Sequence, residues 1–198
     1  ELSPHSRTSL LFGKRPWPIK PDICFEGGNV LTDGGTAFED RHPLLSLRTT
    51  AIHNDLALTS ANATSAATAQ ASRLAALTMA QYPEYWPETV RGLLVHAAEW
   101  TPAMRAEFDA TDGKKEPKLE LLRRYGWGVP TEDAVLRSSR QSVTLVTQDT
   151  FVPFEGTDYK MRRFRLHSMP WPTEMLETIG AGDVTLKVTL SYFVEPSA

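Results

Sequence analysis

The sequence predicts an α/β architecture up to about residue 140, followed by an antiparallel, β-rich segment. Residues 61–80 contain nine alanines, and alanine has the best helix propensity of any residue. Residues 184–194 place an apolar side chain at every second position, which is the period of a half-buried strand. Apolar residues make up 41% and charged residues 23% of the 198 residues, so a collagen-like, coiled-coil or disordered chain is excluded.

The first sixty residues predict little regular structure. Prolines at positions 4, 16 and 18 favour an irregular, extended path up to residue 18. Residues 19–30 predict a short strand and a turn at Gly27-Gly28. Residues 31–48 read as one long loop, and loops of this length in compact domains are often functional. Residues 52–59 are weakly strand-like.

Four helices are predicted between residues 61 and 140. The alanine-rich helix over 61–80 ends at Tyr82-Pro83. Pro87 suits the first position of the next helix, whose apolar residues recur at helical spacing up to Ala97. A short helix is expected around residues 119–122. Thr131 is a good N-cap for a helix over residues 132–137.

Strands dominate the prediction after residue 140. Residues 143–147, 159–167 and 184–194 are strand-like, and a short helix begins near Pro172-Thr173. We therefore divide the chain into residues 1–140 and a β-rich segment of residues 141–198. The second segment is expected to be incomplete, because the chain ends directly after its most regular strand.

Charge and cysteine content exclude several classes of function. Lysine and arginine total 21 against 24 acidic residues, a net charge of −3, so no general attraction to nucleic acid or to an anionic membrane is expected. No apolar run approaches the roughly 20 residues that span a bilayer. The single cysteine, Cys24, excludes an internal disulfide and a cysteine-based zinc site, and it leaves the compartment open.

Neither a metal site nor a cofactor is predicted. Asp109, Asp112 and Glu116 lack the glycine-centred loop of a calcium-binding EF-hand, and the histidines have no ligand-like spacing. Residues 162–165, Arg-Arg-Phe-Arg, fit a solvated strand face better than a nucleic-acid surface in a chain of negative net charge.

Ser65 is the candidate that the residues themselves offer for chemistry. It is expected at the start of the alanine-rich helix, where backbone N–H groups are unpaired and the helix dipole favours negative charge. A nucleophilic serine at that position gains an oxyanion donor from its own amide. A serine at a helix start is more commonly a cap, so both readings stay open on this ground alone.

Three segments resemble subtilisin-like serine proteases (subtilases, peptidase S8), in the family's order. The stretch Ala63-Thr64-Ser65-Ala66-Ala67 resembles the family's Gly-Thr-Ser-x-Ala before its alanine-rich helix, with Ser65 on the nucleophile. Lys20-Pro21-Asp22-Ile23 resembles the strand that precedes the serine. Tyr125-Gly126-Trp127-Gly128-Val129 resembles a segment near the end of the catalytic domain. Together the matches cover residues 1 to about 140.

The resemblance implies a fold and an activity. It implies a subtilisin-like parallel sheet with flanking helices, of which residues 1–140 are the C-terminal half, with the alanine-rich helix among the strands. Residues 141–198 are similar, less specifically, to the β-rich C-terminal extension of some bacterial subtilases. It also implies a serine endopeptidase that acts on a peptide or protein substrate by acyl transfer through Ser65.

The chain departs from the family pattern around the serine. Ala63 stands where the family has glycine, Ala69 replaces a proline and Gln70 a histidine. Ala63 and Thr64 are expected to border the substrate cleft, and His53 could line it. The loop between Asp22 and Ser65 is longer than usual, so substrate contacts there cannot be transferred.

The family's Asp-Ser/Thr-Gly and His-Gly motifs and its oxyanion-hole asparagine do not occur in these 198 residues. We expect the catalytic Asp, His and Asn in a missing N-terminal half, and little or no turnover by the isolated chain, since a serine without a base is a weak nucleophile. A half-sheet exposes strand edges, so association with that half, or self-association, is expected. The alternative is an inactive pseudoprotease that binds a peptide or partner; a structural module that mimics the family by composition fits less well.

Overall fold

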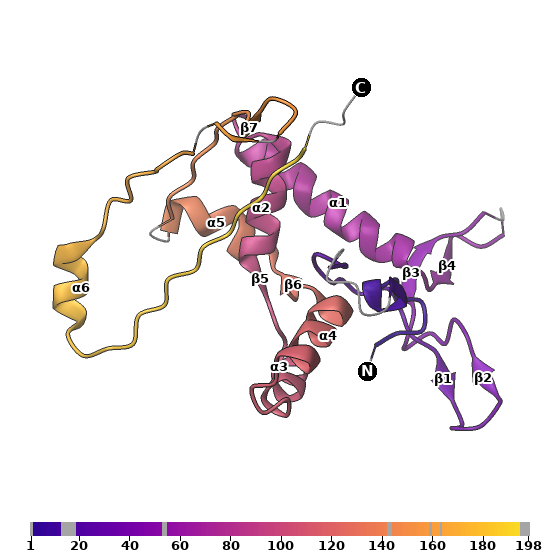
Figure 1. Ribbon diagram of the computed structural model, residues 1–198. Helices are drawn as coiled ribbons and strands as arrows, with labels where there is room; N and C mark the ends of the chain where they lie inside the picture. The colour runs from indigo at the N-terminus through magenta and orange to yellow at the C-terminus, as the bar shows by residue number, and fades with distance from the viewer. Residues whose placement is uncertain are drawn as a thin grey trace.

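The computed structural model describes residues 2–12, 19–52, 55–141, 144–158, 160–162 and 164–194 (Figure 1). Its elements, in chain order, are η1 (Ser9–Phe12, a 3₁₀ turn), β1 (Leu31–Thr32), β2 (Phe38–Glu39), β3 (Leu47–Thr50), β4 (Leu58–Ala61), α1 (Thr64–Gln81), α2 (Pro87–Ala97), β5 (Ala98–Glu99), α3 (Pro102–Asp109), α4 (Lys115–Tyr125), β6 (Val129–Pro130), α5 (Glu132–Gln141), β7 (Phe154–Glu155), β8 (Lys160–Met161) and α6 (Thr173–Ile179). Helices and short strands are thus mixed, as the α/β prediction required.

The alanine-rich helix forms where it was predicted. Helix α1 runs for 18 residues and ends where Tyr82 leaves the helical conformation before Pro83. Only Leu74 and Thr78 on this helix are buried. The buried Thr78 hydroxyl has a hydrogen-bond partner, because it donates to the Leu74 carbonyl oxygen at 2.8 Å.

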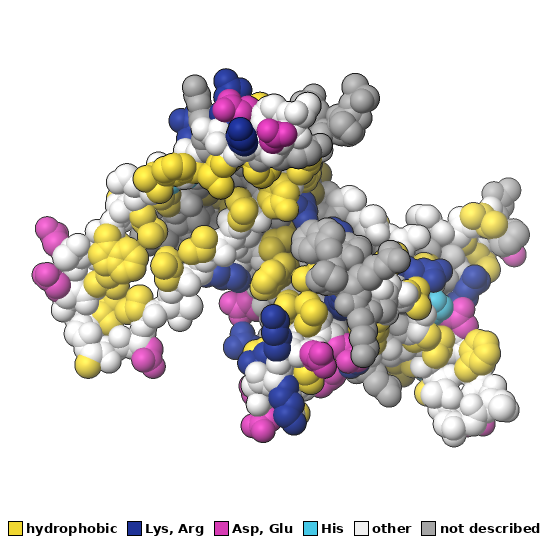
Figure 2. All heavy atoms as spheres, in the orientation of Figure 1, with side chains coloured by type: hydrophobic (Ala, Val, Ile, Leu, Met, Phe, Trp, Pro, Cys, Tyr) yellow, Lys and Arg dark blue, Asp and Glu magenta, His cyan; other side chains and the backbone are white. Residues whose placement is uncertain are grey.

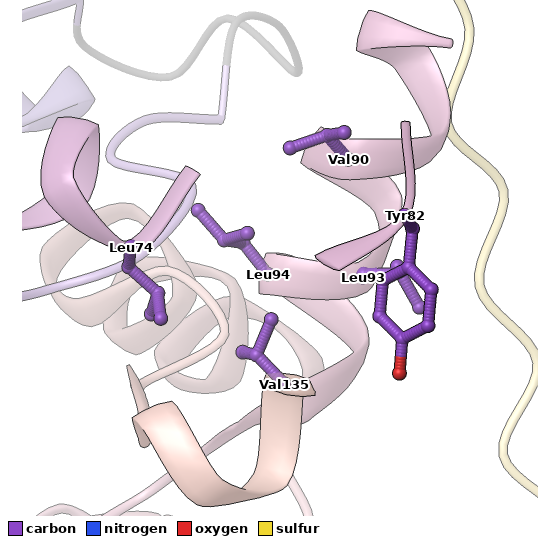
Figure 3. Close-up of a cluster of buried hydrophobic side chains, with 6 residues drawn as sticks. All are labelled: Leu74, Tyr82, Val90, Leu93, Leu94 and Val135. Carbon is purple, nitrogen blue, oxygen red and sulfur yellow. The ribbon is translucent and has the colours of Figure 1, made fainter. Parts of the chain in front are cut away.

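Three helices form the core of the molecule. Helices α1, α2 and α5 contact one another, and six buried side chains meet between them: Leu74, Tyr82, Val90, Leu93, Leu94 and Val135 (Figure 3). The predicted helix starts are confirmed. Pro87 occupies the first turn of α2, and the Thr131 hydroxyl caps α5 by accepting the Ala134 N–H at 3.2 Å.

The predicted parallel sheet is not confirmed. The strands of the described residues form four separate two-stranded pairs, β1–β2, β3–β4, β5–β6 and β7–β8, each antiparallel. The expectation that α1 lies among strands is not confirmed either: among the described helices and strands, its main contacts are with α2 and α5. Residues 31–48, expected to be a loop, instead contain the β1–β2 hairpin and the start of β3.

The segment that precedes the serine is extended but has few backbone partners. The Trp127 N–H donates to the Asp22 carbonyl oxygen at 2.9 Å, and the Cys24 N–H donates to the Gly128 carbonyl oxygen at 2.8 Å. These two bonds run in the parallel sense, but they do not continue into a ladder. Within the described residues this segment is flanked by loops and helices, which offer no continuous row of N–H and C=O groups.

Glycine is required where these two segments meet. Gly126 has φ +56°, and a Cβ added there would lie 2.7 Å from the Asp22 carbonyl carbon. Such a distance is a collision, so a side chain at this position would force the chain apart. The resemblance to the family's Tyr-Gly-x-Gly segment therefore falls on a place where the backbone itself needs glycine.

Helices α3 and α4 form a separate hairpin next to the core. Helix α4 is longer than the short helix expected around residues 119–122, and α3 was not predicted, although Thr101 caps it by accepting the Met104 N–H at 3.3 Å. The Tyr125 hydroxyl donates to Glu107 at 2.8 Å and ties the two helices together.

The C-terminal part differs most from its prediction. Of the three strands expected at 143–147, 159–167 and 184–194, the described residues contain the short β7–β8 hairpin alone, and Val143 and Tyr159 lie outside those residues. Helix α6 forms as predicted, set apart from the helical core (Figure 1). Residues 184–194 are extended but pair with no described strand, because the elements beside them are helical.

Residues 184–194 turn their polar side chains toward α2. His96 Nδ1 lies 2.9 Å from Thr189 Oγ1, and Lys187 Nζ donates to the Ala98 oxygen at 3.0 Å. The alternating apolar residues face away, and Val188 and Leu190 are 79% and 81% exposed. Figure 2 shows hydrophobic side chains exposed along the arch that carries α6.

No helix in the described residues has both the length and the apolar character needed to cross a membrane.

Candidate active site at the start of α1

Ser65 lies in the first turn of α1 with its side chain exposed. The residue before the helix, Ala63, has no side chain that could cap it, and its own N–H donates to the Gly27 oxygen at 2.9 Å. The first backbone N–H groups of a helix have no acceptor within the helix. The Ser65 amide therefore belongs to the positive end of α1, where negative charge is stabilised.

The neighbours of Ser65 face inward. The Thr64 hydroxyl donates to the His5 carbonyl oxygen at 2.5 Å, and Thr64 and Ala67 lie on the wall of a cavity of about 730 Å³. This cavity is lined by the N-terminal residues 2–8, by residues 21–29, by residues 44–46 and by parts of α3 and α4. Ser65 is not on its wall, so the structure brings Ala63, Thr64 and Ser65 together while pointing the serine outward.

Alanine fits the position where the family has glycine. Ala63 has φ −171° and ψ 155°, an extended conformation that any residue adopts. The departure at Ala63 therefore strains no backbone. The backbones of residues 27 and 63 lie close together, since a Cβ added to Gly27 would be 3.3 Å from the Ala63 carbonyl oxygen.

A polar cluster that the sequence analysis did not find lies beside this turn. Asp40, from the end of the β1–β2 hairpin, accepts a hydrogen bond from Asn62 Nδ2 at 3.0 Å, and His5 Nε2 lies 3.4 Å from the same carboxylate oxygen. The hydrogen bond from Asn62 is the main reason why the pKa of Asp40 is lowered, with the bond from the Arg41 N–H and the nearness of His5 adding to it. In the sequence, the unusual length of the loop predicted over residues 31–48 is the feature that could have pointed to this cluster.

The described histidines do not supply Ser65 with a base. His53, the histidine expected to line the cleft, lies outside the described residues. His96 is half-buried on α2 and bonded to Thr189, and burial is the main cause that lowers its pKa. In the part of the chain that the structure describes, Ser65 Oγ has no hydrogen bond to a histidine or a carboxylate.

Other reactive groups near the cavity are poorly suited to catalysis. Burial raises the pKa of the Cys24 thiol, which donates to the Tyr125 oxygen at 3.2 Å, so Cys24 is not an activated nucleophile. Among the described residues, no group of three or more His, Cys, Asp or Glu side chains could hold a metal ion.

Ser65 is thus an exposed serine in the uncapped first turn of an alanine-rich helix. The chain belongs to the subtilase family, a family of serine proteases, because the model of that family, peptidase S8, matches residues 1–128. The match includes both Ser65 and the Tyr125–Gly128 segment. No curated protein and no solved structure matches the chain.

Proposed function

We propose that Ser65 is the nucleophile of a serine endopeptidase that cleaves a peptide or protein substrate by acyl transfer. The observation that carries the proposal is the exposure of Ser65 in the first turn of α1, inside the region that matches the subtilase family. At that position the hydroxyl is open to an approaching carbonyl group. The Ser65 N–H is available to the oxygen that becomes negative during attack.

The remaining catalytic groups come, in this proposal, from a missing N-terminal half of the catalytic domain. A histidine there takes the Ser65 proton and returns it to the leaving amine, an aspartate orients the histidine, and an asparagine completes the oxyanion hole. The extended residues 21–29 belong to no sheet within the described residues, and Ser65 faces outward rather than into the 730 Å³ cavity. Both features support this division of the site.

The same proposal divides the chain. Residues 1–140 are the C-terminal part of the catalytic domain, and residues 141–198 are a C-terminal extension. The end of α5 at Gln141 supports this boundary, because α5 is the last element that contributes to the core of α1 and α2. Exposed apolar residues such as Val188 and Leu190 support association of the chain with a partner.

Peptide hydrolysis tests the proposal. In the full-length protein, Ser65→Ala is expected to lower kcat by roughly 10⁶-fold, because loss of the nucleophile removes the covalent route. Ser72→Ala, an exposed serine two turns along the same helix, is the control and should leave the rate unchanged. The isolated 198-residue chain should show little or no turnover. Cleavage that survives Ser65→Ala would refute the assignment.

The alternative is a pseudoprotease that binds a peptide or partner without cutting it. The observation in its favour is that Ser65 has no hydrogen bond to a histidine or carboxylate within the described residues. A full-length protein that binds peptides with unchanged affinity after Ser65→Ala, and that hydrolyses none, would support this reading instead.

A further inference from the structure

The β1–β2 hairpin reaches the residues that precede Ser65 through a single carboxylate. Asp40 Oδ1 accepts from Asn62 Nδ2 at 3.0 Å and from the Arg41 N–H at 3.0 Å, and it faces His5 Nε2 at 3.4 Å. Arg41 has φ +65°, an uncommon conformation for a residue with a side chain, and it turns the chain directly after this carboxylate. Asn62 and the adjacent Arg41 N–H thus donate to one oxygen, and the His5 ring lies close to it.

Asn62 carries this contact to the backbone beside the serine. Its Nδ2 group also donates to the Asn29 oxygen at 2.9 Å, so both amide hydrogens of the side chain are used. Gly28 makes this position possible, because it has φ +82° and a Cβ added there would lie 2.6 Å from Asn62 Cγ. The Asn62 side chain is therefore held on two sides, by the hairpin and by the segment at 28–29.

His5 holds the other side of the same turn. Its carbonyl oxygen accepts the Thr64 hydroxyl, while its ring lies against Asp40. Asn62 is hydrogen-bonded to Asp40, Thr64 is hydrogen-bonded to the His5 carbonyl oxygen, and the His5 ring lies against Asp40. We call Asp40, His5 and Asn62 the Asp40 clasp. Ala63 has no side chain to cap α1, and the described side-chain contacts at the start of the helix run through residues 62 and 64.

We infer that Asp40 is a positioning residue for the nucleophile: through the Asp40 clasp it fixes residues 62–64 and thereby the direction of the Ser65 hydroxyl and amide. This inference rests on the proposed function, since it takes Ser65 as the nucleophile. Asp40 acts through Asn62 and His5 and is not itself a catalytic residue. A misplacement of about 1 Å at a reacting group can slow a reaction by about 10²-fold, so loosening this turn is expected to be visible in kcat.

The experiment measures two properties of Asp40→Ala in the full-length protein. The first is the rate at which Ser65 reacts with a fluorophosphonate probe, which we expect to fall by about 10- to 10²-fold. The second is hydrogen exchange of the amides of residues 62–66, which should become faster. The matched control is Glu39→Ala, which removes the exposed carboxylate of the residue directly before Asp40 and should change neither property.

Two further variants separate positioning from loss of fold. Asp40→Asn keeps an oxygen that can accept from Asn62, so it should react faster than Asp40→Ala. Combining Asn62→Ala with Asp40→Ala should slow the probe by less than the product of the two single effects, because both variants lose the Asp40–Asn62 hydrogen bond. Circular dichroism shows whether each variant keeps its helices.

The outcomes are distinct. Slower labelling together with faster exchange in Asp40→Ala, with Glu39→Ala unchanged, supports the inference. Unchanged labelling, or slower labelling with unchanged exchange, overturns it. Failure of the unmodified protein to take up label at Ser65 refutes the proposed function instead, and it is seen before any variant is compared.

Discussion

Truncation of Leu94 tests how much packing in the three-helix core contributes to the stability of the fold. Leu94 is 6% exposed on α2 and contacts the cluster that joins α2 to α1 and α5 (Figure 3). Leu94→Ala removes three carbon groups at about 0.8 kcal/mol each, roughly 2.4 kcal/mol of transfer free energy. The cavity left behind raises the expected loss of unfolding free energy to about 3–4 kcal/mol.

Thermal and urea unfolding, followed by circular dichroism at 222 nm, measure this loss. A chain of this size loses roughly 2–4 °C in Tm for each kcal/mol, so Leu94→Ala should melt about 6–16 °C below the parent protein. The control is Leu44→Ala, the same chemical change at a side chain that is 87% exposed, and it should stay within about 0.5 kcal/mol of the parent. Equal losses in the two variants would refute the packing argument, because burial would then not decide the cost.

Two further predictions concern pH and backbone conformation. Burial, and secondarily the charge of Lys187, lower the pKa of His96 below its ordinary 6.5 in the folded chain, so the unfolded chain takes up the proton more readily. The His96 contribution to stability is therefore fully present above about pH 6.5, and it is lost as the pH falls from there toward the folded pKa. Urea midpoints of the parent protein should fall over this pH range, and His96→Gln should lose that dependence. The same pH dependence in both proteins would contradict the prediction. Gly128→Ala should unfold the protein or lower its free energy of unfolding in urea by well over about 2 kcal/mol, because its Cβ would meet the backbone of Trp100. Gly113→Ala, also at positive φ but in open space, should lower it by only about 1 kcal/mol. Similar losses in both variants would show that collision is not the cause.

The helices were predictable where their signal is local. Ser65, Thr64 and Ala63 are adjacent in sequence, and alanine content with the flanking proline predicted α1 and the start of α2. The α3 helix was missed although Thr101 and Pro102 carry a cap and a first-turn proline, which are local signals that could have found it.

The contacts between distant segments were not predictable from one sequence. Asp40 meets Asn62 across 22 positions, and nothing in the composition of the 31–48 loop indicates that its hairpin turns back to the serine. The predictions of a parallel sheet and of C-terminal strands failed for a related reason. Residues 184–194 run extended, as their alternation predicts, but an extended segment becomes a strand only with a partner, and the described residues beside it are helical.

Site-resolved labelling of the full-length protein with a fluorophosphonate tests the central claim most directly. A fluorophosphonate bonds only to a serine whose hydroxyl is activated, and digestion followed by mass spectrometry locates the modified residue. The account predicts one label on Ser65 and none on Ser72, which is exposed on the same helix but lies beyond its first turn. A folded protein that remains unlabelled, or that carries the label at a serine other than Ser65, would contradict it.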